Sequence, residues 1–245
     1  MTQALIMLTS RQLLGRRRVF FIVLLALLPV AVALIYRFGS DRLDPLPVEF
    51  APGMLDALML GAVLPLAALI FGTAALGAEI EDGTAVYLLT KPVDRWRIVL
   101  VKIGVASAAT IAITLPTTIV ASLIVLSGDQ AALTLAFAFA TVVGSIAYCG
   151  IFVALSIKTS RALLVGLGYV FVWEAILPAL FAGTRWASVH QYMLGVADLI
   201  STAPRFALDA DLSGVAAVVA SIVVITLTTV VATQLLERLE IGQRL

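Results

Sequence analysis

Six long apolar stretches occupy most of this 245-residue chain, and each is long enough to cross a lipid bilayer as a helix. A hydrocarbon core about 30 Å thick requires about 20 apolar residues in helical form. The stretches run over residues 19–38, 54–78, 98–126, 131–157, 162–182 and 212–236. With such short connections a closed β-barrel is excluded, and a helical bundle satisfies the backbone in lipid. The sequence therefore predicts an all-α integral membrane protein with one domain, residues 1–245, built as a bundle of six transmembrane helices.

The composition leaves no room for a separate soluble enzyme. Hydrophobic residues make up 62% of the sequence and charged residues only 13%, which is far from the balance of a soluble domain. The single cysteine, Cys149, lies inside the fourth stretch, so an intramolecular disulfide and a cysteine metal cluster are both excluded. We expect Cys149 to be a small packing residue.

Basic residues are distributed unevenly between the two sides of the predicted bundle. With the N-terminus inside, one side carries twelve of them: Arg11, Arg16, Arg17, Arg18, Lys91, Arg95, Arg97, Lys102, Lys158, Arg161, Arg238 and Arg244. The other side carries four: Arg37, Arg42, Arg185 and Arg205. Lys and Arg accumulate on the cytoplasmic side of short loops, so both termini are expected in the cytoplasm. This asymmetry is typical of membrane topology, and the basic run at residues 16–18 is not expected to bind nucleic acid.

Residues 1–18 are predicted to form an elbow helix that lies at the inner membrane interface and leads into the first span. Leu5 and Leu8 share one helical face, and the basic cluster lies nearby. The basic run, the apolar stretch and the segment from Ala31 to Ala33 also have the outline of a cleavable signal peptide. Because the apolar run continues to Phe38, which is long enough to span, we expect the segment to remain uncleaved.

Two connections are expected on the outer side of the membrane. The first, residues 39–53, is predicted to be irregular because it contains three prolines, Pro45, Pro47 and Pro52. The second, residues 183–211, mixes aromatic and aliphatic residues with polar ones. This content predicts short amphipathic helices that rest on the outer leaflet or dip into it.

The densest run of charge, residues 79–97, separates the second stretch from the third. A turn at Gly83 and a cap at Thr84 predict a helix of about two turns that ends before Pro92. Three apolar side chains then project from charged surroundings: Val86, Leu88 and Leu89. Their exposure to water is unfavourable unless a partner or the membrane interface covers them. The segment is either a docking helix for a cytoplasmic partner, which we favour, or an ordinary solvated loop.

Four hydroxyl residues recur at every fourth position of the third stretch: Thr110, Thr114, Thr118 and Ser122. This spacing places them on one helical face. In one interpretation the hydroxyls bond to backbone carbonyls or to a neighbouring helix. In the other they line a polar path through the bundle.

Glu174 lies well inside the fifth stretch, where a carboxylate is unfavourable unless it is protonated or paired. We expect a structural bond to Trp173, to a Ser or Thr, or to Arg37. Gating or contact with a substrate is the alternative role. His190, in the second outer connection, has no partner at metal-ligand spacing and is expected to be an ordinary surface histidine.

Ten residues in and beside the charged segment form a recognisable pattern: Glu79, Glu81, Gly83, Thr84, Leu88, Leu89, Pro92, Val93, Arg95 and Lys102. In this pattern, and in its basic elbow, six spans and long last outer connection, the chain resembles the type-2 (ABC-2) permeases of ABC exporters. Residues 168–174 also resemble the fifth span of some bacterial members, and four residues resemble the connection that follows it: Gly183, Arg185, Ser188 and Tyr192.

The resemblance implies that residues 79–97 carry a coupling helix that sits in a groove of a separate ATP-binding subunit. The coupling residues are then Glu79, Glu81, Gly83, Thr84, Val86, Leu88, Leu89, Pro92 and Arg95. This chain has no G-x-x-x-x-G-K-[ST] motif, so ATP is expected to bind the partner, and no cofactor and no catalysis are expected here. The implied partners are two ATPase subunits and a second permease, either an identical copy or a paralogue, in a bacterial cytoplasmic membrane.

Three other functions are weighed against this one. A secondary transporter usually shows internal repeats and several charged or interrupted helices, whereas only Glu174 fits that description here. An intramembrane enzyme needs a constellation that a single glutamate cannot supply. A membrane anchor or regulatory subunit that recruits an ATPase without transporting would present the same docking helix.

Overall fold

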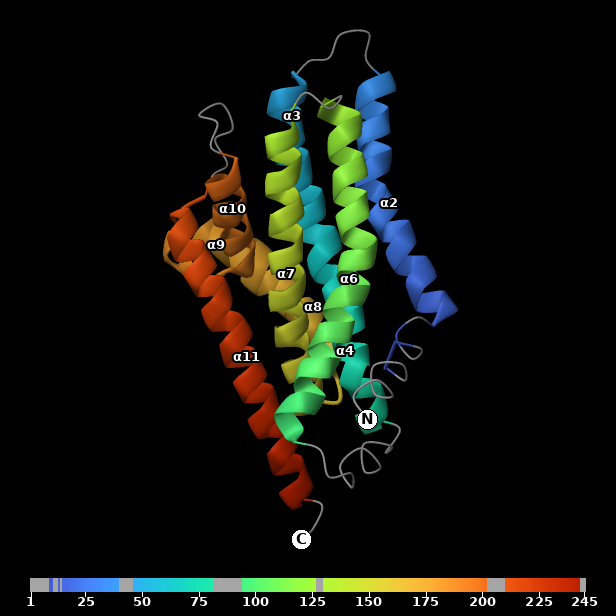
Figure 1. Ribbon diagram of the computed structural model, residues 1–245, viewed down its shortest axis with the longest axis vertical. Coiled ribbons are helices and arrows are strands. Elements are labelled where there is room, and N and C mark those ends of the chain that lie inside the picture. Colours follow the sequence, from blue (N-terminus) through green and yellow to red (C-terminus); the bar gives the residue numbers. More distant parts are fainter. Residues whose placement is uncertain are drawn as a thin grey trace.

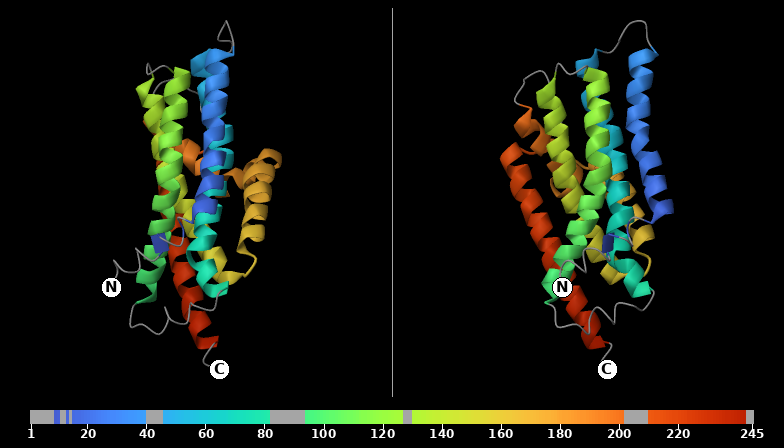
Figure 2. Two further views of the ribbon diagram at one scale, coloured as in Figure 1. Left: turned by 90° about the vertical axis from the view of Figure 1, so that its right-hand side faces the viewer. Right: turned by 45° about the vertical axis from the view of Figure 1, so that its right-hand side comes forward.

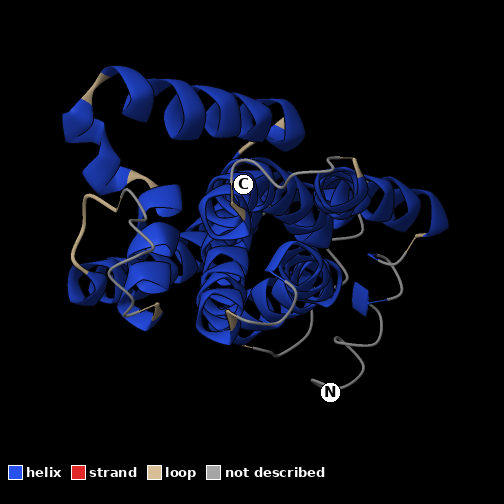
Figure 3. Ribbon diagram, turned by 90° about the horizontal axis from the view of Figure 1, so that it is seen from above, coloured by secondary structure: helices blue, strands red, loops and turns tan. Residues whose placement is uncertain are grey.

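The computed structural model describes residues 9–10, 13, 15–39, 46–81, 94–126, 130–201 and 210–242. Every regular element among these residues is a helix, as the view from above shows (Figure 3). Six helical segments among them are long and apolar enough to cross a membrane: Arg18–Phe38, Pro47–Gly77, Arg95–Leu126, Ala131–Lys158, Ala162–Leu180 and Gly214–Arg238. The predicted all-α membrane fold is therefore confirmed. Most of the predicted elbow lies outside the described residues, and the cytoplasmic placement of both termini stays a prediction.

The elements follow one another along the chain as α2 (Arg16–Phe38), α3 (Pro47–Met54), η1 (Leu55–Val63), α4 (Leu64–Glu81), α6 (Arg95–Leu126), α7 (Ala131–Lys158), α8 (Ala162–Gly168), η2 (Tyr169–Ile176), α9 (Leu177–Leu180), η3 (Ala182–Ala187), α10 (Val189–Ile200) and α11 (Gly214–Gly242). η1 and η2 are π-helical, and η3 is a 3₁₀-helix. The second span thus consists of α3, η1 and α4, and the fifth consists of α8, η2 and α9.

The long helices stand side by side, so the bundle has two distinct ends (Figure 1). α6 begins at the end drawn lowest in Figure 1, where α4, α7 and α11 finish, and α2 begins on the same side but higher in the picture. We call this the lower end and the opposite one the upper end. The segment of residues 82–93, which carries most of the predicted coupling residues, connects two helices at the lower end.

α7 is the central helix of the bundle. It packs against α4, α6, α10 and α11. Of its most apolar stretch of 18 residues, 67% is buried. The corresponding share is 17% in both the fifth and the sixth spans. The fifth span accordingly stands at the periphery, as the views in Figure 2 show. The inner helices form the core, and the outer ones expose apolar faces.

The second span begins earlier than the sequence predicts. Residues 39–53 were expected to be irregular, yet α3 begins at Pro47 and continues without interruption into η1. Pro47 stands in the first turn of α3, where its fixed φ suits a helix. Backbone N–H groups in a first turn have no carbonyl partner within the helix, so the N–H that proline lacks costs no hydrogen bond. The prediction of an irregular loop was wrong for this part because proline disrupts a helix interior but favours a helix start.

The two π-helical segments each adjoin a proline inside the same span. Pro52 precedes η1, and Pro178 follows η2. A proline inside a helix removes one backbone hydrogen bond, and π-helical turns are rare features that frequently mark functional sites. Both segments also contribute an acidic side chain to one cavity, which is described below.

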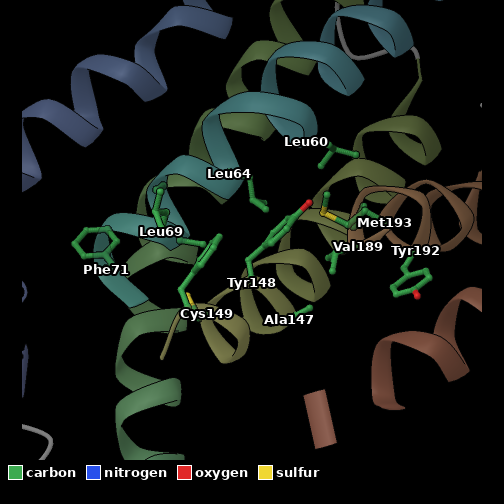
Figure 4. Packing of buried hydrophobic residues seen from close by; sticks show 14 of the residues in the cluster. Leu60, Leu64, Leu69, Phe71, Ala147, Tyr148, Cys149, Val189, Tyr192 and Met193 are labelled. Carbon is green, nitrogen blue, oxygen red and sulfur yellow. The ribbon is translucent and has the colours of Figure 1, made fainter. Parts of the chain in front are cut away.

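α10 is the principal element of the second outer connection, and it packs into the bundle. Its buried residues are Val189, Gln191, Tyr192, Met193, Leu194, Gly195, Val196 and Ala197. Met193 lies near Tyr148 of α7 and Leu60 of the second span (Figure 4). α7 and α11 therefore cover most of the helix, and contact of this connection with the outer leaflet stays a prediction.

Candidate functional site

A buried ion pair joins the second and third spans at the lower end. The Nζ atom of Lys102 lies 2.6 Å from Oε1 of Glu79, and the two side chains are 1% and 7% exposed. Glu79 lies near the end of α4, and Lys102 lies in the second turn of α6. The pair therefore joins the two helices that residues 82–93 connect in the chain. The sequence pattern contained both residues, but it did not predict that they form a pair.

The other predicted coupling residues divide between described and undescribed parts of the chain. Arg95 begins α6, and Glu81 ends α4 with an undescribed side chain. Six predicted coupling residues lie outside the described residues: Gly83, Thr84, Val86, Leu88, Leu89 and Pro92. Beside Arg95, Arg97 pairs with Asp94 at 3.0 Å, and its guanidinium lies 5.2 Å from the centre of the Trp96 ring.

The hydroxyl stripe of the third span faces α7 and is fully buried. Thr110, Thr114 and Thr118 each donate to the backbone carbonyl four residues earlier, at 2.9 Å. Thr118 also lies 3.2 Å from the hydroxyl of Thr141, and Ser122 lies 2.6 Å from that of Thr134 on α7. Such bonds tie two apolar helices together where no water competes. These bonds fit the interpretation in which the hydroxyls bond to backbone carbonyls and to a neighbouring helix. A role of the hydroxyls in a transport path stays a prediction.

Glu174 is enclosed by four hydrogen-bond donors. Oε1 accepts from the hydroxyl of Tyr169 at 2.7 Å and from the N–H of Val189 at 3.1 Å. Oε2 accepts from the hydroxyl of Ser188 at 2.6 Å and from the N–H of His190 at 3.2 Å. The carboxylate of η2 thus caps the first turn of α10, where free N–H groups and the helix dipole favour negative charge.

Of the bonds expected for Glu174, the one to a serine is present and the others are replaced. Trp173 donates its indole N–H to the carbonyl of Ala187 instead, at 3.1 Å. Arg37 is not among the described hydrogen-bond partners of Glu174. The carboxylate therefore fixes the connection between the fifth span and α10.

His190 is not the surface histidine that the sequence predicts. Its Nε2 atom lies 2.7 Å from Oδ1 of Asp56 in η1, and the side chains are 20% and 34% exposed. Burial by itself lowers the pKa of His190, but the bond to Asp56 and the negative charges of Asp56 and Glu174 outweigh it and raise that pKa. The charged imidazolium is consequently more favourable here than in an ordinary solvent-exposed histidine.

A cavity of about 780 Å³ lies in the upper half of the bundle, among η1, α7, η2, α9, η3 and α10. Glu174, His190 and Asp56 all line this upper cavity, together with Arg185 and Asp211. Arg185 pairs with Asp211 at 2.8 Å and donates to the carbonyl of Pro178 at 2.9 Å. The wall therefore combines fixed charges of both signs with apolar side chains.

Tyr148 of α7 lies at the wall of the upper cavity and is fully buried. Its ring packs among Leu64, Val189 and Met193, with the hydroxyl at the end nearer Leu60 (Figure 4). The hydroxyl makes no well-aligned hydrogen bond to a described residue, although Glu174 is near enough to act on it electrostatically.

Sequence reasoning identified Glu174 but missed Asp56 and the pair of Lys102 with Glu79. Asp56, near the start of the second apolar stretch, was not singled out, and Lys102, near the start of the third, was counted only among the basic residues of the inner side and in the family pattern. The signal that identifies them is a lone charge within a stretch that is otherwise apolar. In the part of the chain that the structure describes, no three His, Cys, Asp or Glu residues gather as metal ligands.

Comparison with known families gives one match, over residues 13–197, to the family model described as ABC-2 family transporter protein. The match covers more than half of the chain and includes the first five spans and most of α10. No curated protein matches the chain.

Proposed function

The chain belongs to the ABC-2 family of transporter proteins as a multi-pass membrane permease component, and on this premise we propose that it is the permease subunit of an ATP-driven exporter. ATP is bound and hydrolysed by a separate ATPase subunit. The ATPase docks on residues 79–97, and its motion is converted into a rearrangement of the bundle.

The observation that carries the proposal is the buried pair of Glu79 with Lys102. A force applied to a loose loop would be lost in bending of the loop. Here the helices on both sides of residues 82–93 are joined within two turns of that segment, so a push on the segment would move α4 and α6 together. Packed helices that shift as rigid bodies are a common basis of switching in proteins.

The second span offers a continuous route from the lower end to the upper cavity. Glu79 and Asp56 lie on the same span, one near each end, with α4 and η1 between them. Asp56 in turn holds the side chain of His190 on α10. Movement of α4 along its axis would therefore act on the wall of the upper cavity through this pair.

The assembly that we propose contains two permease and two ATPase subunits in a bacterial cytoplasmic membrane. The second permease is an identical copy or a paralogue. Apolar side chains are exposed on the peripheral helices, including Phe21 on α2, Leu164 on α8 and Ile222 on α11, so lipid or another subunit covers these faces. A bundle with few fixed charges favours an amphipathic cargo.

The proposal is tested by coexpressing the chain with a candidate ATPase encoded by the adjoining reading frame. We expect the two proteins to purify as a stoichiometric complex that hydrolyses Mg-ATP in lipid nanodiscs. A folded permease that purifies without the ATPase would contradict the proposal. In vesicles that contain the complex, export of a fluorescent amphipathic probe only with ATP would separate an exporter from an anchor, and export driven by an ion gradient alone would indicate a secondary transporter.

A further inference from the structure

A second cavity, of about 360 Å³, opens at the lower end of the bundle between α2, α4, the end of α7 and the start of α8. This lower cavity is separate from the upper one and shares none of its lining residues. Its polar wall contains Arg18, Thr73, Ser156, Thr159, Ser160 and Arg161. The lower ends of α4 and α8 lie side by side in both views of Figure 2.

The charge of the lower cavity has one sign. Arg18 and Arg161 are its charged residues, and no described carboxylate lines it. Neither guanidinium forms an ion pair with another described residue. Guanidinium groups remain charged at any physiological pH and offer several donors in a planar fork that suits a phosphate.

The surrounding helix adds to the positive potential. Arg18 lies in the first turn of α2, which contains no acidic residue and has no side-chain cap. The N-terminal end of a helix carries partial positive charge, so the position of Arg18 does not stabilise its own helix. An anion in the cavity would compensate both the arginines and this helix end.

The rim of the cavity is apolar and faces outward. Leu163 and Leu164, at the start of α8, are 46% and 67% exposed, and both line the cavity. Ile70 and Ile80 of α4 continue the apolar surface on the other side. A ligand that places a phosphate between the arginines and hydrocarbon chains along these residues matches both parts of the wall.

We propose that the lower cavity binds the headgroup of an anionic phospholipid, with its phosphate between Arg18 and Arg161 and its acyl chains along Leu163 and Leu164. Basic pockets between membrane helices are suited to such headgroups, because the bilayer supplies the lipid at high local concentration. The bound lipid would brace the peripheral fifth span against α4. The proposal is independent of the proposed function, since neither ATPase nor cargo enters it.

The test measures lipid retained by the purified full chain. Wild type is incubated in detergent with equal amounts of phosphatidylglycerol and phosphatidylcholine, and bound lipids are counted by native mass spectrometry. The variants are Arg18→Gln, Arg161→Gln and their combination. Arg238→Gln, an exposed arginine on α11 that does not line the cavity, is the matched control.

We expect wild type and Arg238→Gln to retain phosphatidylglycerol in preference to phosphatidylcholine. Each substitution in the cavity should weaken retention about fivefold, as expected for one basic residue near an anionic lipid. Arg161→Lys, which keeps the charge, should retain more lipid than Arg161→Gln and shows whether a loss arises from charge or from misfolding. Gel filtration verifies that each variant is folded.

Three outcomes would overturn the proposal. Equal retention of the two lipids by wild type, or undiminished retention by the folded double variant, would exclude a headgroup site between these arginines. Release of the lipid from wild type by millimolar inorganic phosphate would identify a site for free anions instead of lipid.

Discussion

Asp56 and Glu174 hold the same residue, His190, from two different spans. Asp56 lies 2.7 Å from the imidazole Nε2 atom, while Glu174 accepts the backbone N–H of His190 at 3.2 Å. Each carboxylate stands in a π-helical segment, one in the second span and one in the fifth. The first turn of α10 is therefore the point at which these two irregular spans are joined, and it forms part of the wall of the upper cavity.

Replacement of Glu174 by glutamine should destabilise the junction with α10. All four described contacts of the carboxylate come from donors, and two of these are backbone N–H groups that cannot become acceptors. The NH₂ group of a glutamine would face one pair of these donors, and a donor cannot accept their hydrogen bonds. We therefore expect a loss of about 1–3 kcal/mol in the free energy of unfolding. Thermal unfolding in detergent measures the loss. A melting temperature equal to that of wild type would contradict this account of Glu174.

The attachment of α10 should weaken as the pH rises. The pKa of His190 is raised above its ordinary value of 6.5, because the bond to Asp56 and the nearby negative charges outweigh burial. A group with a raised pKa contributes stability that is complete below its unfolded pKa and is lost as the pH passes through its folded pKa. The other charged groups of the cavity wall, Arg185 and Asp211, are paired with each other.

The measurement compares the melting temperature of wild type and His190→Gln across a pH series. We expect the difference between them to be largest at acidic pH and to shrink above pH 6.5. A difference that grows with pH would show that the histidine is bound in its neutral form.

Removal of Lys102 should be far more harmful than removal of the whole ion pair. Lys102→Met leaves the Glu79 carboxylate buried without this counter-ion, which typically costs about 3–5 kcal/mol. Combining it with Glu79→Leu replaces both charges by apolar groups and should restore most of the stability. Denaturation in mixed detergent micelles compares the three proteins. If the double variant is as unstable as the single one, the pair is not the main interaction of Lys102.

Acidic residues in the predicted docking helix should prevent ATPase binding and leave the bundle intact. Leu88→Asp and Leu89→Asp place charge on the surface that we propose the ATPase covers, and desolvating an unpaired charge at an interface is costly. We expect loss of the copurified ATPase with unchanged membrane insertion. Leu46→Asp, the same change at an exposed position at the upper end, is the matched control. Stoichiometric ATPase bound to either docking variant would refute the docking role.

A single methyl group at Gly195 should disturb the packing of α10 on α11. An added Cβ would lie 2.5 Å from the Cβ of Ala217 and 3.2 Å from the carbonyl oxygen of Leu212. Overpacking of this kind costs about 1–3 kcal/mol, so Gly195→Ala should lower the melting temperature. The same change at Gly104 of α6, where nothing lies within 4 Å, should be neutral or stabilising. Equal behaviour of the two variants would rule out close packing as the reason for Gly195.

The charged segment and the polar residues within the spans show how far sequence reasoning reaches. The run at residues 79–97 can be recognised from the sequence because charge between two apolar stretches is a local pattern. Glu174 can be recognised for the same reason. The partners of Glu174 cannot be predicted in this way, because Ser188 and His190 reach it only after the chain turns back at η3. The early start of the second span was missed because proline has opposite effects at a helix start and in its interior.

The sequence by itself determined the fold class and the number of spans, because a bilayer requires each span to be a continuous run of apolar residues. Only the tertiary structure decided which polar side chains meet. Asp56 and His190 are separated by more than a hundred residues, and their contact depends on how each helix is rotated and on the π-helical turns that shift its register. Side-chain contacts between helices depend on packing geometry, which hydropathy and residue spacing do not encode.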